Sequence, residues 1–148
     1  MTIKSTTDLT CAIYQDALNI RKAVFVKEQH VPENLEIDAN ESKTIHFVKY
    51  IKQQPVGTAR LLPCPDKNFN LIQRVAVMKA ARHQHIGSEL IKAIVHYHLA
   101  HYPDQALQLG AQEHAIEFYE ALGFQVIADE PAYLDAGMRH REMRLIVK

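Results

Sequence analysis

The fold is decided by residues 71–88, which read LIQRVAVMKAARHQHIGS. The half from Leu71 to Val77 is rich in β-branched and apolar residues and predicts a strand. The half that begins at Arg82 predicts a tight turn and the start of a helix, because an apolar stripe with i, i+4 spacing follows directly. That stripe consists of Ile86, Leu90, Ile91, Ile94, Val95 and His98. A strand, a turn and a helix start therefore follow one another without a linker.

The turn from Arg82 to Ser88 is a candidate phosphate site. The first amides of a helix have no acceptor inside the helix and lie at the positive end of its dipole, so they attract anions. Gly87 lets an anion approach the backbone, Ser88 adds a hydroxyl donor, and Lys79 and Arg82 add positive charge. Neither the Rossmann nor the Walker glycine pattern is present. On these residues alone, the commoner alternative is an ordinary junction that binds nothing.

The composition of the chain restricts its partners and location. Its 148 residues fit one domain, 1–148, that is large enough to bury a core. Lysine and arginine total 17, and so do aspartate and glutamate, which leaves no net attraction to nucleic acid or to an anionic membrane surface. No apolar run approaches the roughly 20 residues that span a bilayer, so we expect no membrane segment and no export signal. Two cysteines without partner spacing, Cys11 and Cys64, indicate a reducing compartment, and we expect a cytoplasmic protein.

Hydrophobic periodicity and turn residues predict the remaining elements. A loop should follow Pro32, because no apolar repeat follows the proline. Gly123 stands where a left-handed helix cap belongs, with Phe124 placed for the accompanying apolar contact. The predicted elements are a helix over Asp16–Lys27, the loop Glu33–Glu41, strands over Ile45–Ile51 and Val56–Leu62 joined by Lys52–Pro55, a strand over Ala106–Leu109, a helix over Glu113–Leu122 and a final strand in which Met143, Leu145 and Val147 alternate. The fold class is α+β, with an antiparallel meander followed by strand, helix, strand, helix and strand.

Several motifs in a fixed order extend along nearly the whole chain. They are VFVKEQ at 24–29 with Val31-Pro32, RVAV at 74–77, Arg82 to Gly87, Gln112 with Phe118-Tyr119 and Leu122-Gly123-Phe124, and Leu134 to Gly137 with His140. In this combination the chain resembles small bacterial members of the GCN5-related N-acetyltransferase (GNAT) family. The resemblance implies the GNAT fold, a single domain with a mixed, largely antiparallel twisted sheet that is flanked by helices and splayed at the cofactor-binding strand. His85 replaces the first glycine of the family pattern Gln/Arg-x-x-Gly-x-Gly/Ala, so either its imidazole points outward or cofactor affinity falls.

The resemblance implies acetyl-CoA as the co-substrate, with its pantetheine inserted beside the strand Leu71–Val77 and its pyrophosphate on the amides of the turn. The implied cofactor-binding residues are Val75, Ala76, Val77, Arg82, His83, Gln84, His85, Ile86, Gly87, Ser88 and Gln112. Tyr119 stands where the resemblance places the family's general acid. A phenol suits this role, because it is protonated at neutral pH and can donate to the departing thiolate. The alternatives are that Tyr119 only packs in the core and that Gln112 is an ordinary residue at a helix start.

The acceptor side has fewer candidates. An amine is mostly protonated at neutral pH, so a base must remove its proton, and we expect Glu28 to bind the acceptor as that base. The alternative for Glu28 is a solvated acid at a helix end. Arg60 and Arg74 face either solvent or the acceptor, where they favour a carboxylate or phosphate. His46 and His140 either approach the acceptor or are structural. The nine histidines lack the spacing of a chelating pair, so we expect no metal.

The function expected from the resemblance is N-acetyl transfer. An acetyl group passes from acetyl-CoA to a primary amine by direct attack in a ternary complex, and the acceptor is a small molecule or a peptide amine. No nucleic acid and no membrane takes part. The alternative is a non-catalytic acyl-CoA-binding or protein-interaction domain of the same fold, in which His85 weakens the phosphate turn. A homodimer through the final strand and the Tyr133–Arg141 loop is a further expectation.

Overall fold

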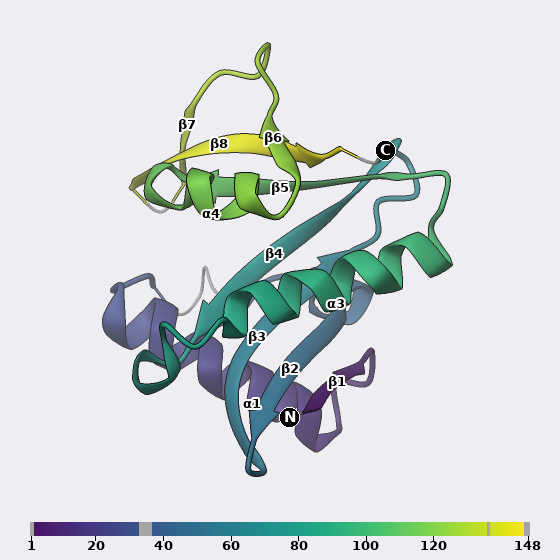
Figure 1. Cartoon of the computed structure of the whole chain (residues 1–148). Helices are drawn as coiled ribbons and strands as arrows, with labels where there is room; N and C mark the ends of the chain where they lie inside the picture. Colours follow the sequence, from purple (N-terminus) through teal and green to yellow (C-terminus); the bar gives the residue numbers. More distant parts are fainter. Residues whose placement is uncertain (1, 33–36, 136, 147–148) are drawn as a thin grey trace.

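The strand predicted over Leu71–Val77 lies at the centre of the structure as β4 (Phe69–Val77). The computed structural model describes residues 2–32, 37–135 and 137–146, and in this part of the chain eight strands form one sheet in the order β1-β2-β3-β4-β5-β8-β6, with β7 paired to β8 (Figure 1). The other strands are β1 (Thr2–Thr6), β2 (Ile45–Ile51), β3 (Gln54–Leu62), β5 (Ala106–Gln112), β6 (Phe124–Val126), β7 (Tyr133–Asp135) and β8 (Met138–Leu145). Among the strands of the described residues, only β4 and β5 pair in parallel. The predicted α+β class and mixed, largely antiparallel sheet are confirmed.

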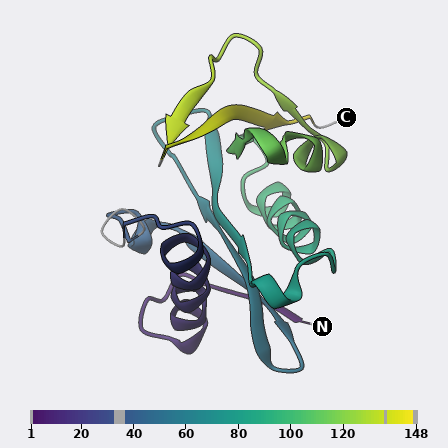
Figure 2. The same cartoon turned by 90° about the vertical axis from the view of Figure 1, so that its left-hand side faces the viewer.

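Helices cover both faces of this sheet (Figure 2). On one face lie α1 (Ala12–Arg21) and the π-helix η1 (Lys22–Glu28), and on the other lie α3 (Ile86–His101) and α4 (Ile116–Ala121). The short 3-10 helices are η2 (Glu41–Lys43), η3 (Lys79–Ala81) and η4 (Glu113–Ala115). Each face buries its own apolar cluster, one around Ile20 of α1 and one around Ile91 of α3. The sheet thus shields the apolar stripes of both helix layers from water.

A glycine in β3 allows the start of α3 to lie close against the sheet. A Cβ at Gly57 would come within 2.7 Å of Ile86 Cγ2 and 3.0 Å of Leu90 Cδ1, and both of these side chains are buried. A larger residue at 57 would therefore displace the helix. The turn that precedes α3 is positioned by this contact.

A β-bulge interrupts β4 at its middle. One residue of β3, Ala59, faces two residues of β4, Arg74 and Val75. Arg74 has φ +56°, a left-handed conformation that costs a non-glycine residue about 1–2 kcal/mol. The bulge shifts the phase of the side chains, so Ile72 packs in the α3 cluster whereas Ala76, four residues later, packs under α1.

β4 and β5 pair only along their first residues. The parallel ladder runs from Phe69 opposite Ala106 to Ile72 opposite Leu109, and the strands then diverge (Figure 1). From Gln73 onward the edge of β4 has no ladder partner in β5. The splay predicted at the cofactor-binding strand is confirmed.

Several predicted boundaries were wrong. β1 was missed, because this polar edge strand has no alternating apolar face beyond Ile3. The first helix begins at Ala12 and continues as a π-helix, which no periodicity indicated. The hairpin turn consists of Lys52 and Gln53 alone, both with positive φ, and β3 already begins at Gln54.

The predicted helix cap at Gly123 is confirmed. Its φ is +99°, its amide donates to the carbonyl of Glu120 over 3.1 Å, and Phe124 is buried in the core. Residues 33–36 of the predicted loop and Val147 of the final strand lie outside the described residues. Among the described residues, no helix has the length and apolar character that crossing a bilayer requires.

Candidate active site

The divergence of β4 and β5 opens a cavity of about 490 Å³, which we call the cleft. Both faces of the sheet contribute to its lining. On the face of α3 and α4 the lining includes Ile72, Leu109, Ala115 and Tyr119. On the opposite face it includes Phe25, Gln73, Arg74, Gly110, Tyr133, His140 and Glu142. A molecule in the cleft can therefore be approached from either side of the sheet.

The predicted cofactor strand lies along this cleft. Val75 lines the cleft, and Ala76 is buried under α1. Val77 lies next to the start of α3, 3.9 Å from the position that a Cβ of Gly87 would take. β4 therefore leads from the cleft to the predicted phosphate turn.

The turn leads directly into α3. The first helical hydrogen bond runs from Glu89 N to the carbonyl of His85 over 3.0 Å, so the amides of residues 86–88 precede the helical ladder. His83 and His85 have φ +67° and +63°, both in the left-handed region. Their side chains and that of Gln84 are exposed, so the imidazole at 85 does not pack into the protein.

Gly87 has a packing role in addition to any role with an anion. A Cβ at this position would lie 3.3 Å from Phe118 Cζ, tighter than an ordinary contact. The neighbouring Ile86 is buried beneath the turn, and Ser88 is half-buried. The turn is thus held by β3 below it and by α4 beside it.

Glu28 lies at the turn before α3, where it pairs with Arg82, and does not line the cleft. Arg82 donates two hydrogen bonds to its carboxylate, of 2.6 and 2.7 Å, and a third of 3.1 Å to the carbonyl of Val77. The hydrogen bond from Arg82 lowers the pKa of Glu28, which makes the carboxylate a weaker proton acceptor. These observations contradict the prediction of Glu28 as the base. Glu28 instead joins the end of η1 to the start of the turn.

Tyr119 packs in the core and also lines the cleft. It is 8% exposed and packs edge-on against Phe118 and Phe124, with ring centroids 5.0 and 6.1 Å apart, yet it also lines the cleft. Burial raises the pKa of its hydroxyl to about 12, so the phenol keeps its proton at physiological pH. Gln112, at the end of β5, lines the same cleft.

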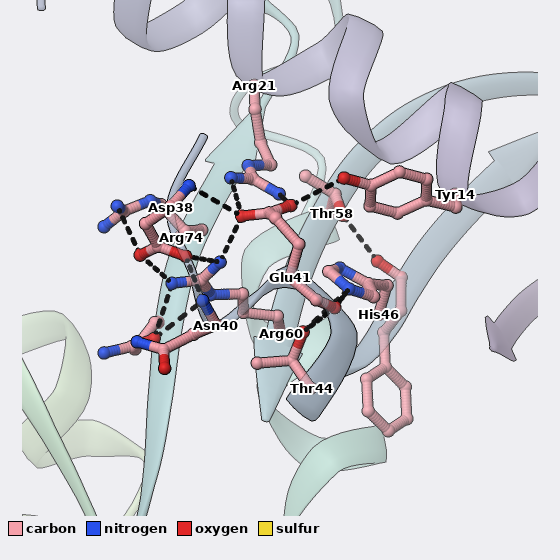
Figure 3. A network of polar contacts seen from close by, with 12 residues as sticks. Tyr14, Arg21, Asp38, Asn40, Glu41, Thr44, His46, Thr58, Arg60 and Arg74 are labelled. Carbon is pink, nitrogen blue, oxygen red and sulfur yellow. Dashed lines mark hydrogen bonds and ion pairs between the residues drawn. The ribbon is translucent and has the colours of Figure 1, made fainter. Parts of the chain in front are cut away.

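Arg60 belongs to a buried network and not to the acceptor side of the cleft (Figure 3). It is 1% exposed and donates to Glu41 Oε2 at 2.7 Å, to Asp38 Oδ2 at 2.8 Å and to Gln73 Oε1 at 2.8 Å. Arg21 donates two further hydrogen bonds to Glu41, of 2.8 and 2.9 Å. The prediction that Arg60 binds an acceptor is therefore wrong, because its guanidinium is buried among these partners. Strand alternation alone did not reveal the carboxylates on the opposite element.

Arg74 does line the cleft. Its Nη2 lies 3.3 Å from Asp38 Oδ2, so the same carboxylate contacts Arg60 in the core and Arg74 at the cleft (Figure 3). The bulge turns this side chain onto the face of α1 and residue 38. Of the two arginines predicted for the acceptor, the structure thus brings only Arg74 to the cleft.

Polar residues of β7 and β8 line the cleft, although the sequence predicted a loop over Tyr133–Arg141. Here β7 and β8 form a hairpin. Met143 of β8 is in the core, and His140 and Glu142, on the alternate positions, line the cleft. The sequence contains this alternation, but the predicted final strand was based on Met143, Leu145 and Val147 and did not include His140 and Glu142.

Tyr133, His140 and Glu142 form one ordered group. The Tyr133 hydroxyl donates to Glu142 Oε2 at 2.9 Å, and its ring stacks on His140 with centroids 5.6 Å apart. A Cβ at Gly110 would overlap the Tyr133 hydroxyl, so β5 needs glycine where this group crosses it. Burial raises the pKa of the Glu142 carboxyl.

The histidines do not gather at a metal site in the part of the chain that the structure describes. That part contains no group of three or more histidine, cysteine, aspartate or glutamate side chains placed to hold a metal ion. His46 is buried, with its Nε2 2.7 Å from Thr44 Oγ1 and 2.9 Å from the Glu41 carbonyl, so it is structural. Of the two histidines considered for the acceptor side, only His140 lines the cleft.

Comparison with known proteins adds to this geometry. The family model of the acetyltransferase (GNAT) domain matches residues 10–147. The chain belongs to the GNAT family. It is 35% identical over 129 residues to the uncharacterized N-acetyltransferase YjcF of Bacillus subtilis, which covers 87% of this chain and 89% of that protein. The crystal structure of Escherichia coli ElaA is similar with a TM-score of 0.85 at 28% identity, over 98% of this chain and 100% of that one.

A second solved structure agrees. An acyl-CoA N-acyltransferase from Pseudomonas aeruginosa has a TM-score of 0.86 at 29% identity, over 98% of this chain and 97% of that one. Membership of the GNAT family supports an acyltransferase that takes its acyl group from an acyl-CoA.

Replacing His85 by glycine tests the turn. His85→Gly should raise the free energy of unfolding by up to about 1 kcal/mol, because glycine adopts the left-handed conformation without steric cost. Acetyl-CoA affinity, measured by calorimetry, should stay unchanged or tighten. His83→Gly is the matched control at the other left-handed position. A marked loss of affinity in His85→Gly alone would show instead that the imidazole contacts phosphate.

The buried network predicts a loss of stability in acid. Burial alone raises the pKa of Glu41, but hydrogen bonds and charges from Arg21, Tyr14 and Arg60 outweigh burial and hold the pKa well below its ordinary value. The stabilisation is therefore complete above the unfolded-state pKa of about 4.3 and is lost as the pH falls below it. Glu41→Gln should cost about 3–5 kcal/mol at neutral pH and flatten this acid dependence in urea unfolding. Glu120→Gln, at an exposed site, is the control; an equal effect of both changes would contradict the role of the network.

Proposed function

We propose that this GNAT protein transfers an acetyl group from acetyl-CoA to a primary amine by direct attack in a ternary complex. The observation that carries the proposal is the opening between β4 and β5, which begins where the ladder ends at Ile72 and Leu109. An extended ligand placed there pairs with the unpartnered strand edge as an added strand would. Pantetheine, with its two amide groups, has the length and the chemistry for this position.

The phosphate groups of the cofactor fit the turn at the far end of β4. We infer that the amides of residues 86–88 bind the pyrophosphate, since they precede the ladder of α3 and lie at its positive end. Arg82 is adjacent and already pairs with the carboxylate of Glu28. The inferred cofactor contacts are those of Val75, Ala76 and Val77 on β4, Arg82 to Ser88 in the turn, and Gln112 on β5.

Acyl transfer needs a stabilised oxyanion and a proton for the leaving group. Attack on the thioester places negative charge on its carbonyl oxygen, and an amide fixed in β4 stabilises this charge better than mobile water does. Tyr119, which burial keeps protonated, is in the cleft to protonate the departing thiolate. A domain that only binds acyl-CoA has no need of a protonated phenol in its cleft, so this observation favours the enzyme.

The acceptor enters from the face opposite α3 and α4 in this proposal. The cleft lining on that face comes from η1, the β4 bulge and the β7-β8 hairpin, and it holds both cationic and acidic side chains, Arg74 and Glu142 among them. A small molecule or a peptide amine fits such a lining. Residues 1–148 then act as one acetyltransferase domain, and dimerisation through β8 stays a prediction.

Binding and turnover test the proposed function separately. Calorimetry should detect acetyl-CoA and CoA, and a screen that follows CoA thiol release should identify the acceptor among polyamines, amino acids, aminoglycosides and peptides. Absence of binding of either ligand at millimolar concentration would remove the enzyme proposal. Binding of acetyl-CoA without thiol release for any amine would leave the non-catalytic alternative in its place.

The role of Tyr119 can be tested by removing its hydroxyl alone. Tyr119→Phe should lower kcat about a hundredfold, as loss of a general acid does, while acetyl-CoA affinity changes little. Tyr97→Phe is the matched control, because Tyr97 of α3 packs against Phe47 and does not line the cleft. Wild-type turnover in Tyr119→Phe would contradict the assignment, and a parallel loss of acetyl-CoA affinity would indicate a packing role.

A further inference from the structure

Direct attack requires a base, and this requirement rests on the proposed function. An alkylamine is mostly protonated at neutral pH, and its nitrogen has no lone pair for attack until a proton is removed. Glu28 is excluded by its place at the turn and by its pairing with Arg82. The other side chains of the cleft that can accept a proton are His114, Tyr133, Asp135, His140 and Glu142.

Four of these five groups are poor candidates. His114 and Asp135 are exposed at the rim, where water competes for any bound proton. The Tyr133 hydroxyl is protonated and donates to Glu142, and both burial and this hydrogen bond raise the pKa of Tyr133 further. Burial raises the pKa of Glu142, but the hydrogen bond that its Oε2 accepts from Tyr133 lowers it and makes the carboxylate a weaker proton acceptor. His140 is left as the buried base of the cleft.

The contacts of His140 fix both its orientation and its tautomer. It is 8% exposed, and its ring stacks on Tyr133 at an interplanar angle of 20°. Its Nδ1 lies 2.8 Å from the carbonyl oxygen of Met138. A carbonyl oxygen only accepts hydrogen bonds, so Nδ1 must carry the hydrogen, and the lone pair of the neutral ring is then on Nε2. The proton acceptor Nε2 therefore belongs to a residue that lines the cleft.

The position of His140 is also suited to an incoming amine. On β8 the core residue Met143 occupies the alternate face, so His140 and Glu142 lie on the side of the sheet opposite α4. Tyr119 lies on α4 and packs in the core on the other side. The proposed acid and the candidate base thus approach the opening between β4 and β5 from its two faces.

We propose that Nε2 of His140 is the general base that deprotonates the acceptor. It takes one proton from the ammonium group and passes it to solvent. The neutral nitrogen then forms the N–C bond to the thioester carbon, and the C–S bond breaks. Tyr119 protonates the thiolate, and the second proton of the nitrogen returns to Tyr119 through water. The sum is an ammonium plus acetyl-CoA giving the amide, CoA thiol and one released proton.

The variant that tests this role keeps the structural hydrogen bond and removes only the base. His140→Asn places an amide NH₂ where Nδ1 donates to Met138, but it has no counterpart of Nε2. Two probe acceptors distinguish the loss of a base from a structural effect. Butylamine is protonated at pH 7 and needs a base, whereas acetohydrazide is neutral there and does not. We expect kcat/KM for butylamine to fall about a hundredfold, that for acetohydrazide to change only a few-fold, and acetyl-CoA affinity to stay constant. His96→Gln, exposed on α3, is the control.

The pH dependence gives a second readout. In His140→Asn, kcat/KM for butylamine should rise with pH until the amine itself is neutral, because only the free amine can then attack, and the wild type should exceed the variant most at neutral pH. The titratable groups that share the cleft with His140 are His114, Tyr119, Tyr133, Asp135 and Glu142, and Arg74 adds a charge from β4. Tyr133→Phe should leave the pH profile close to that of the wild type, because it keeps the ring that stacks on His140 and removes only the hydroxyl that donates to Glu142.

Failures of the base assignment and of the proposed function are distinguishable. Equal losses for both probes in His140→Asn would assign His140 a structural role, and unchanged rates would exclude it as the base. Nitrogen NMR of the wild-type protein tests the tautomer without any variant or acceptor, and a hydrogen on Nε2 would overturn the proposal. If wild type binds acetyl-CoA but transfers to no amine, the proposed function fails instead. His140→Gln is the replacement should the asparagine variant not fold.

Discussion

The structure depends on one constraint, the need of backbone amides and carbonyls for hydrogen-bond partners. β4 and β5 satisfy this need mutually only as far as Ile72 and Leu109, after which the two strands separate. The left-handed Arg74 shifts the phase of β4 at this point. An opening in the middle of a sheet costs the hydrogen bonds that the two strands would otherwise exchange. The cleft is the space that results.

The elements around the opening are positioned by close packing. Gly57 brings the start of α3 onto β3, and Gly87 lets that start meet Phe118 of α4. The turn before α3 and Tyr119 are thus held by the same helix pair. The pair between Arg82 and Glu28 adds a link from the turn to η1, whose residue Phe25 lines the cleft. The turn and the cleft therefore share mechanical support.

Charge is distributed unequally between the two faces. Glu41 and Asp38 hold Arg21, Arg60 and Arg74 together under α1, and Glu41 loses its solvation in the process. Buried ion pairs of this kind add little net stability, but removing one partner leaves an uncompensated charge. Such a network favours one arrangement of residues 38–41 and the bulge over alternatives. The other face of the cleft contains mainly apolar side chains and the phenol of Tyr119.

Local patterns in the sequence determined β4, the turn, α3 and the helix that carries Tyr119, because i, i+2 and i, i+4 spacing and turn residues are read over a few positions. They also sufficed for the α+β class and the family. Only the tertiary structure decided that Glu28 binds Arg82, 54 residues away, that Arg60 is buried and that His140 lines the cleft. These outcomes arise from contacts between distant elements and from a bulge that reverses side-chain alternation, and neither leaves a periodic signal in the sequence.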